Sequence, residues 1–520
     1  MRPILWRLHY LGGILAAPIL LSLVVTGILF AWSPQLDALR FGDITGRSAG
    51  PAVPLSEQVV AAQAAHPDWR VHSVVPGHDV AAGPDLTTAV ILDPPGGADG
   101  HGTPEDGVAV FVDETTGRAT GEVALADTSE AVLRSMHSSW TLGADAEPLT
   151  ELAASWFLVA LATGVFLWWP GLRRRGSAAF AFRRGIGGRR HAKDWHSFLA
   201  LALLLPMVFL AITGLTWTDG AGERYDDAKA ALSPPPPGGV DAALPAPSSG
   251  AADPAAIDRV AAVASGAGLR TPVRFSVPQD DRTAWTVRSE DATFPVERDQ
   301  LAVDGASGRV VERFDYSDEN WLNKLSTGGM LFHQAQLFGL GTQIFMTVLA
   351  LGIGAIIAFG YRMWWMRRPA GGWGAPPPQR DWVRSAPIGL LALVVVLAWA
   401  LPTLAVALAV WLVLERAALW WRVGAEAQRA RKQGRAPVHG VGSSGWEACK
   451  AAVVAALGIA MIAGPHVGDG DPALGALGRL VAWAWSVPLG IAFLAAGLLG
   501  LYATFAVGGR AQDARREVIS

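Results

Sequence analysis

The chain has 520 residues, of which 51% are hydrophobic and only 17% are charged, with 22 tryptophans and a formal net charge of −3. This balance is typical of a membrane protein and argues against a soluble enzyme, and we expect membrane lipid and no nucleic acid among its partners. The only cysteine is Cys449, which excludes disulfide-stapled domains and a C-x-x-C-H site for covalent haem.

Uncharged windows long enough to cross a bilayer, which takes roughly 17 to 25 residues, mark the membrane spans. Four such windows are clear: Leu11 to Trp32, Leu152 to Trp169, Ser197 to Thr218 and Leu337 to Tyr361. The first is too long for a signal-peptide core and lacks a small-residue cleavage site, so we expect it to remain as an anchor. Further apolar windows follow Arg384, and Pro402 within them could close a tight hairpin or kink one helix.

The distribution of charge predicts the orientation of these spans. Residues 173–193 carry eight Lys or Arg and no acid, whereas residues 33–151 hold 18 acids against five bases and residues 219–336 hold 18 against 11. Basic loops stay in the cytoplasm, so both long acidic segments are expected in the periplasm of a bacterial inner membrane, with the N-terminus inside.

The expected fold class is a mainly α polytopic membrane protein with two small α+β periplasmic domains and extra C-terminal transmembrane helices. The first four spans are placed at 1–32, 151–170, 196–218 and 337–365, and the periplasmic domains at 33–150 and 219–336. Cytoplasmic loops are placed at 171–195, 366–384 and 422–446. The extra spans are placed at 385–421 (a hairpin or one kinked helix), 447–465 and 477–509, so a count of seven or eight spans stays open.

The first 370 residues read as an internal duplication. Thr26-Gly27 follows His9 by 17 residues (26 minus 9), and Thr213-Gly214 follows His196 by the same spacing (213 minus 196). A second pair of landmarks is His137 with Gly143 and His333 with Gly339, six residues apart in each case. The halves therefore correspond from end to end.

Each periplasmic segment shows the same local elements. Helices are expected near Ser56 to Ala65 and near 257–264, with strands at Val108 to Val112 and Leu301 to Val303. The Asp-x-x-Thr/Ser-Gly turns that follow the strands place Gly117 and Gly308 in the left-handed region. Residues 78–107 look like a flexible loop. The histidines of the first segment, His66, His72, His78 and His101, fit no metal-binding spacing and are expected on the solvated surface.

Four of the 11 histidines stand at equivalent ends of the two halves: His9, His137, His196 and His333. Ionisable side chains at membrane spans are costly and usually functional, although any single one could be an interfacial histidine reaching water. His9 and His196 begin spans from the cytoplasmic side, and the other two precede spans entered from outside. Because the hydrocarbon core between these levels is about 30 Å thick, the four cannot meet at one zinc ion.

Two pairs stacked across the membrane can form, and a pair of neutral imidazoles is the standard way to hold haem iron axially inside a four-helix bundle. The sequence thus predicts two non-covalent b-type haems, with His9 and His196 as axial ligands at one level and His137 and His333 at the other. His191 competes with His196 but falls outside the repeat register. Glycines such as Gly12 and Gly352 could admit a flat macrocycle, although ordinary small-residue helix packing explains them equally well.

The units Leu8-His9 to Thr26-Gly27, Met136-His137 to Thr163-Gly164 and Trp195-His196 to Thr213-Gly214, with the Val-Asp-x-x-Thr/Ser-Gly-Arg turns, resemble the PepSY-associated transmembrane helix family. The resemblance covers residues 1 to about 370 and implies PepSY-like periplasmic domains. It also implies a ferric-siderophore reductase with two b haems, ligated by the same four histidines. The fourth unit departs from the pattern, because Gly352 and Gly354 stand in place of Thr-Gly.

Three functions compete. The first is electron transfer from a quinol or a cytoplasmic reductase to a periplasmic acceptor such as a ferric siderophore, for iron uptake; no catalytic residue is assigned. The second is a non-redox PepSY-type binding or regulatory protein, a protease inhibitor or sensor, which leaves the histidines unexplained. The third is a transporter, disfavoured because both halves share one orientation and broken spans with polar centres are not expected.

Overall fold

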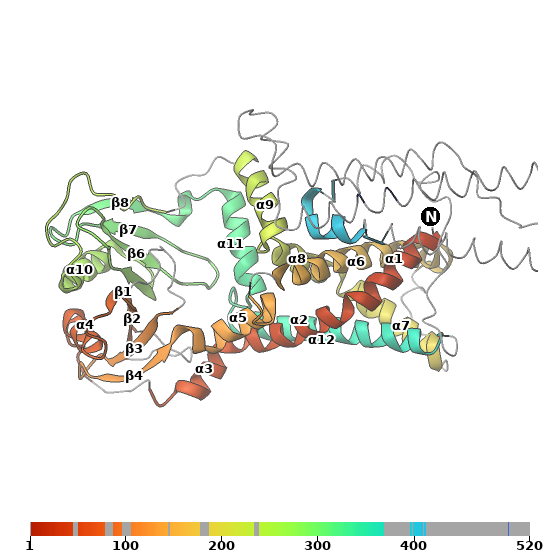
Figure 1. Cartoon of the computed structure of the whole chain (residues 1–520), viewed down its shortest axis with the longest axis horizontal. Coiled ribbons are helices and arrows are strands. Elements are labelled where there is room, and N and C mark those ends of the chain that lie inside the picture. Colours follow the sequence, from red (N-terminus) through yellow and green to blue (C-terminus); the bar gives the residue numbers. More distant parts are fainter. Residues whose placement is uncertain are drawn as a thin grey trace, which may run out of the picture.

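A computed structural model describes residues 2–44, 50–77, 87–95, 106–143, 146–176, 187–232, 239–368, 396–397, 399–408, 410–411, 494 and 498. These residues form a helical bundle at one end and a β-sheet domain at the other (Figure 1). The expected span at 447–465 lies outside the described residues. Those at 385–421 and 477–509 also lie outside them, apart from short helical pieces within 396–411 and the two single residues 494 and 498.

The bundle contains two unbroken helices long and apolar enough to cross a membrane, α6 (Glu147–Arg175) and α12 (Leu340–Trp365). The first and third expected spans are bent pairs of helices. The first pair, α1 (Arg2–Leu15) and α2 (Ala17–Ala31), meets at 53°. The second pair, α7 (Gly188–Ala202) and α8 (Leu204–Leu215), meets at 64°.

The first and third expected spans are therefore broken, which the sequence did not predict. Each bend falls just before a proline, Pro18 or Pro206, whose ring cannot follow a continuous helical backbone. The residues around both breaks are Leu and Ala, so neither break has a polar centre. Both breaks agree with the prediction that broken spans with polar centres are absent.

Shorter helices connect the bundle to the sheet: α3 (Ser33–Phe41), α5 (Ser129–Ser139), α9 (Asp219–Leu232) and α11 (Trp321–His333). α5 packs against α2, and α11 packs against α8. The short helix α5 carries His137, and α11 ends at His333. The helix α9 was not predicted from the sequence.

The described residues between 396 and 408 contact the bundle through an apolar cluster that includes Leu401 and Leu404 and through one buried carboxylate. Glu151 of α6 is 2% exposed and accepts hydrogen bonds from the backbone N–H groups of Gly220 (3.1 Å) and Ala221 (3.2 Å) at the start of α9. Its other oxygen accepts from the Thr403 hydroxyl at 2.7 Å. A carboxylate at a helix N-terminus is stabilised by the helix dipole and the unpaired N–H groups there. Glu151 was not among the functional or structural residues predicted from the sequence.

The two long segments between spans contribute four strands each to one continuous antiparallel sheet. The strands of the first segment are β1 (Arg70–Val75), β2 (Thr87–Asp93), β3 (Val108–Asp113) and β4 (Ala119–Ala124). Those of the second are β5 (Val273–Ser276), β6 (Trp285–Ser289), β7 (Gln300–Val303) and β8 (Val310–Phe314). The strand order is β4-β3-β2-β1-β5-β6-β7-β8. The segments join where Val74 of β1 pairs with Phe275 of β5.

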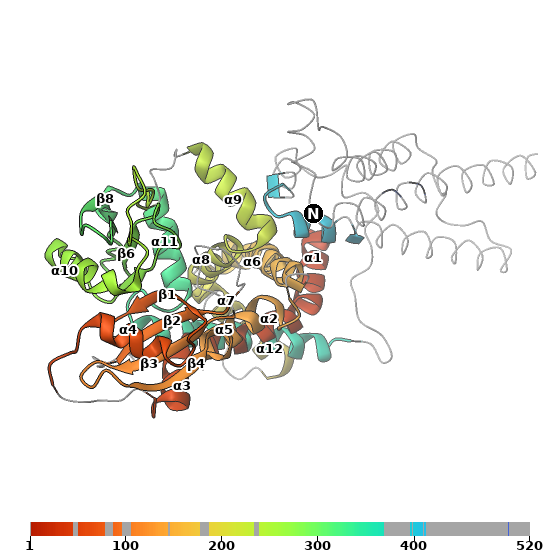
Figure 2. The same cartoon turned by 60° about the vertical axis from the view of Figure 1, so that its left-hand side comes forward.

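One face of the sheet carries the main apolar core. Helices α4 (Leu55–Gln63) and α10 (Ile257–Ala267) cover it, on the side remote from the bundle (Figures 1 and 2). Val74 and Phe275 both belong to this core, together with Val59 of α4 and Ile257 of α10. A shared core and a shared sheet therefore make the two segments one packed unit.

Several local predictions for these segments are confirmed. Helices α4 and α10 and strands β3 and β7 lie where the sequence placed them, within a few residues. Gly117 and Gly308 have φ values of +65° and +73°, the left-handed turn positions that were expected. The prediction of a loop over 78–107 is wrong for β2, whose seven residues are all buried. Thr87, Thr88, Val90 and Ile91 are β-branched and favour a strand. The Gly- and Pro-rich residues on either side made this stretch resemble a loop.

We predict that Phe275→Ala lowers the free energy of unfolding by about 3–5 kcal/mol, because a buried aromatic side chain at the junction of the two segments is lost. Phe275 is 5% exposed. Unfolding of the purified protein, followed by tryptophan fluorescence, measures the change.

Val310→Ala is the control, since Val310 is 41% exposed on the edge strand β8 and should change stability by less than about 0.5 kcal/mol. If both variants unfold alike, the junction does not carry the stability assigned to it.

Candidate functional site

The four histidines singled out by the sequence lie on four different helices: His9 on α1, His137 on α5, His196 on α7 and His333 on α11. The structure brings His9 and His196 together, with ring centroids 6.1 Å apart and ring planes at 87°. His137 and His333 are close enough to interact electrostatically. The two expected pairs are therefore the two pairs that approach one another.

The pair formed by His9 and His196 is held from behind by the long helices. His9 Nδ1 lies 2.9 Å from the carbonyl oxygen of Ala160 on α6 and 3.2 Å from the Thr163 hydroxyl. His196 Nδ1 lies 2.9 Å from the carbonyl oxygen of Ile356 on α12. A carbonyl oxygen can only accept a hydrogen bond, so Nδ1 carries the proton in both rings.

The pair formed by His137 and His333 is held by threonine hydroxyls of the bent spans. Thr26 Oγ1 on α2 lies 2.9 Å from His137 Nδ1, and Thr213 Oγ1 on α8 lies 3.0 Å from His333 Nδ1. Each hydroxyl donates its own proton to the backbone one turn earlier, to the carbonyl oxygens of Ser22 and Phe209. Each threonine therefore accepts from the histidine, and Nδ1 again carries the proton.

All four imidazoles are thus fixed in the same tautomer. With the proton on Nδ1, the lone pair is on Nε2, which has no hydrogen-bond partner among the residues that the structure describes. Metal-binding histidines in proteins are oriented in this way, with the second ring nitrogen bonded to a carbonyl or another polar group. The arrangement leaves two-nitrogen sites, each with its ligands already oriented.

A glycine lies beside each ring. An added methyl group would stand 3.3 Å from His137 Cε1 at Gly27, 3.2 Å from His9 Cε1 at Gly164 and 3.0 Å from His333 Cε1 at Gly214. These three glycines let the rings lie directly on the helix backbone, within reach of the polar atoms that hold Nδ1. The Thr-Gly pairs were recognised in the sequence, but the contact of their glycines with the histidine rings was not predicted.

The fourth ring lies beside Gly360, where an added methyl group would stand 3.6 Å from His196 Cε1. The sequence suggested Gly352 and Gly354 as the counterparts of Thr-Gly in the fourth unit, but the glycine beside the ring is Gly360. A side chain at Gly352 would collide with Leu203, and one at Gly354 would meet only Val24. The 196-residue offset between His137 and His333, applied to Gly164, gives Gly360 and would have identified it.

Gly12 is also explained by helix packing. An added methyl group there would stand 2.9 Å from the Trp156 ring of α6, so the glycine lets α1 and α6 approach closely. The interpretation that Gly12 and Gly352 clear space for a macrocycle is therefore replaced by the packing alternative that the sequence left open.

The other histidines of the described residues lie elsewhere. His66 contacts Glu122 at 2.7 Å, and His72 Nδ1 lies 3.2 Å from the Ser73 hydroxyl. His191 is exposed and accepts from the Trp195 indole at 3.1 Å, so it does not compete with His196. Among the residues described, no three His, Cys, Asp or Glu side chains gather to hold a metal ion. His78, His101, His439, His466 and Cys449 lie outside the described residues.

The two histidine pairs lie at different depths of the bundle. His9 and Thr26 are separated by 17 residues of the bent helix pair α1–α2 (26 minus 9), which is about 25 Å of helix at 1.5 Å per residue before the bend shortens it. The spacing from His196 to Thr213 along α7–α8 is the same (213 minus 196). The sheet domain lies on the side of α5 and α11, the helices that carry His137 and His333 (Figure 1).

Comparison with protein-family models gives a match over residues 6–367, more than two thirds of the chain, to the family described as PepSY-associated TM region. The match ends close to the last residue of α12, so it includes all four histidines and excludes the residues after 396. Comparison with curated proteins gives no match.

We predict that Thr26→Val and Thr213→Val each lower the free energy of unfolding by about 1–3 kcal/mol, because each leaves a half-buried Nδ1–H without its acceptor. The change is measured as a shift in thermal unfolding of the purified protein.

Thr216→Val is the matched control, because the Thr216 hydroxyl donates only to the carbonyl oxygen of Thr213 and contacts no histidine. A Thr216 variant as unstable as the other two would show that the loss arises from the helix and not from the histidine.

Proposed function

The chain belongs to the PepSY-associated TM region family, and from this premise we propose that it is a di-haem b protein of the bacterial inner membrane. It moves electrons from a quinol or a cytoplasmic reductase to a periplasmic acceptor and acts as a ferric-siderophore reductase in iron uptake. In this proposal the bundle is a duplicated four-helix haem-binding bundle, and the sheet domain is a pair of PepSY-like domains on the periplasmic side.

The observation that carries the proposal is the common tautomer of the four histidines. His9, His137, His196 and His333 all donate from Nδ1 and leave Nε2 unpaired, in two pairs on facing helices. A protein that only binds or senses a partner has no use for this arrangement. A b haem held by both histidines of a pair would need a free Nε2 on each of them.

The ring separation of the His9 and His196 pair fits one iron. Two imidazoles that each bonded a metal through nitrogen at about 2.0 Å would have ring centroids roughly 6 Å apart, and those of His9 and His196 are 6.1 Å apart. His9 and His196 would hold one b haem, and His137 and His333 would hold the other. A b haem supplies one-electron oxidation and reduction when bound.

The chain's own contribution is to orient and polarise the ligands. The Nδ1 hydrogen bonds to Ala160, Ile356, Thr26 and Thr213 prevent rotation of the imidazoles and make Nε2 a stronger donor to iron. The tight contact with glycine prevents the rings from moving toward the helices. Ligands held in this way need little rearrangement when the metal changes oxidation state.

The basic end of the bundle supports the proposed orientation. Arg173, Arg174 and Arg175 end α6, and Arg362 lies in the last turn of α12. α7 begins at the same end with Arg189 and Arg190, and the acidic sheet domain lies at the other end. Positive charge accumulates on the cytoplasmic side, and this supports a periplasmic position for the sheet domain, next to α5 and α11.

We predict that the protein purified from haem-replete cells is red, with about two six-coordinate low-spin b haems per chain, because two histidine pairs are available. His9→Ala and His196→Ala should each remove one haem, and His137→Ala and His333→Ala should each remove the other. Pyridine haemochrome content and the spectrum of each variant measure this outcome.

His191→Ala is the control and should retain both haems, because His191 bonds Trp195 and lies outside the pairs. Colourless wild-type protein would contradict the electron-transfer proposal and favour the non-redox binding or regulatory alternative. Loss of the same haem from the His9 and His137 variants would contradict the pairing.

We predict vectorial electron transfer in liposomes with reductant sealed inside and a ferric chelate outside, in the presence of a ferrous-iron trap. External iron should be reduced by the wild type. His333→Ala should abolish this reduction while the remaining haem is still reduced, since electrons then stop halfway. Reduction at the wild-type rate by the His333 variant would remove the haem of the His137 and His333 pair from the route and would contradict the siderophore-reductase proposal.

A further inference from the structure

The face of the sheet opposite the main core differs between the two segments. On β2, β3 and β4, this face carries a second apolar cluster: Ala89, Ile91, Ala109, Phe111 and Val123, with Phe41, Ile44 and Leu125 packed against it. The same face of β5 and β6 carries Arg274 and Arg288 instead, since their neighbours Phe275 and Val287 point into the main core. This face of the sheet is therefore apolar and covered in the first segment and cationic in the second.

Arg274 and Arg288 stand directly opposite each other on adjacent antiparallel strands. Like charges in this position destabilise a sheet, so a counter-charge is needed. Glu290 supplies it: its carboxylate takes two bonds from Arg274, at 2.7 Å from Nε and 3.0 Å from Nη2, and one from Arg288 at 3.0 Å. Burial would raise the pKa of Glu290, but these two arginines outweigh burial and hold it below its ordinary value.

A third arginine adds a positive charge to this cluster. Arg298, on the loop between β6 and β7, is partly buried and lies within electrostatic range of Arg288 and Glu290. Its Nε is buried without a hydrogen-bond partner, and among the described residues no carboxylate lies within ion-pair distance of it. Burial, and then repulsion from Arg288, lower the pKa of the Arg298 guanidinium. The cluster holds three guanidinium groups and one carboxylate.

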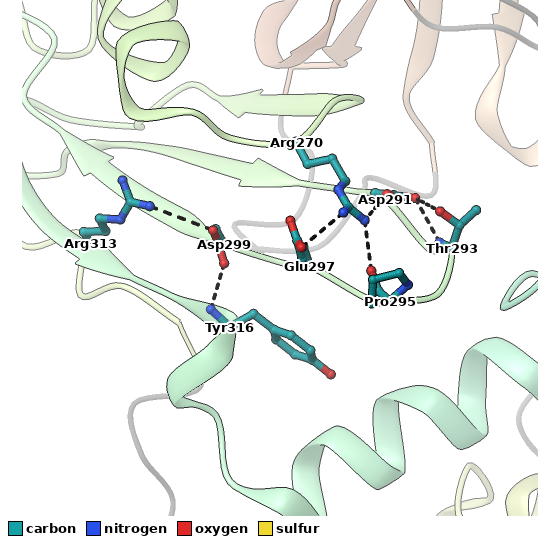
Figure 3. A network of polar contacts seen from close by, with 8 residues as sticks. All are labelled: Arg270, Asp291, Thr293, Pro295, Glu297, Asp299, Arg313 and Tyr316. Atoms are coloured by element: carbon teal, nitrogen blue, oxygen red, sulfur yellow. Dashed lines mark hydrogen bonds and ion pairs between the residues drawn. The ribbon is translucent and has the colours of Figure 1, made fainter.

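The acids near Arg298 along the loop are already engaged (Figure 3). Arg270 binds Asp291 at 3.0 Å and Glu297 at 3.1 Å, and it donates to the carbonyl oxygen of Pro295 at 2.9 Å. Asp299 accepts from the backbone N–H of Tyr316 at 2.8 Å and lies 3.9 Å from Arg313. These contacts shape the loop, and none of these three acids forms an ion pair with Arg298.

The loop that carries Arg298 rests on the turn that follows His333. The Phe294 N–H donates to the carbonyl oxygen of Leu337 at 2.8 Å, and the Phe294 ring packs on Phe338 with centroids 5.6 Å apart. His333 ends α11, four residues before Leu337. The loop that carries Arg298 thus links the cationic cluster to the turn that follows His333.

We propose that Arg298, together with Arg274 and Arg288, binds the carboxylate groups of an anionic, oxygen-ligated ferric chelate at this sheet face, which the loop links to the turn after His333. The inference rests on the proposed function and names the charge class of its substrate. A guanidinium fork matches a carboxylate with two parallel hydrogen bonds, and a free, partly desolvated fork is the donor such a ligand needs. The corresponding face of the first segment is apolar and covered, so it offers no equivalent site.

Binding can be tested without electron transfer by using gallium(III) citrate, since gallium(III) resembles ferric iron in its chelation and is not reduced. Full-length protein in nanodiscs of neutral lipid should bind gallium(III) citrate by calorimetry. Arg298→Gln should weaken binding roughly tenfold or more, the loss expected for a charged hydrogen bond. Arg298→Lys should weaken it less, because the charge remains while the fork is lost.

Arg309→Gln is the matched control, with the same loss of charge at the opposite end of β7, on the exposed turn before β8. It should bind gallium(III) citrate as the wild type does. For reduction of ferric citrate, Arg298→Gln should raise KM, whereas KM for a neutral ferric hydroxamate should change little. Unchanged thermal unfolding and haem content in Arg298→Gln exclude a folding defect.

Absence of gallium(III) citrate binding, or equal binding by Arg298→Gln and Arg309→Gln, would overturn the proposal. Displacement of the chelate by phosphatidylglycerol in the nanodisc would assign the cluster to a lipid headgroup and would also overturn it. These outcomes are separate from failure of the proposed function, which appears as missing haem and leaves gallium binding unaffected.

Discussion

The hydrogen bond from each histidine Nδ1 into a neighbouring helix is the interaction on which the arrangement of the bundle depends. The bond requires a ring lying almost against the helix backbone, and the glycines at 27, 164, 214 and 360 provide that space. A side chain there would push the imidazole away from its acceptor and release the tautomer. The Thr-Gly pairs are therefore best understood as ring-docking positions, and Phe359-Gly360 is a variant in which a carbonyl oxygen alone is the acceptor.

The bends of the first and third spans serve the same geometry. α1 and α7 carry one pair of histidines, while α2 and α8 supply the threonines that hold the other pair. A proline at each break lets one span change direction between the two levels without leaving a charged group in the bundle. α5 and α11 can then approach α2 and α8 from the side of the sheet.

The sheet domain holds together the two long segments that carry His137 and His333. The β1–β5 contact and the core shared by α4 and α10 hold the two long segments together, and through α5 and α11 they fix where His137 and His333 stand. The segments have equivalent strands but unlike faces toward the bundle, one closed by an apolar cluster and the other lined by arginines. Equivalent backbones with different side chains are the usual basis for placing a specific site on only one of two similar units.

The sequence by itself determined the membrane class, the histidine pairs and several helices and turns, because hydropathy, charge and exact spacings are local or periodic properties. Only the tertiary structure decided the eight-stranded sheet, the burial of β2 and the contact of Glu151 with Thr403. Each of these depends on residues far apart in the chain, such as Val74 with Phe275 and Glu151 with Thr403. No local pattern encodes such contacts, since an antiparallel strand looks the same in sequence whichever partner it meets.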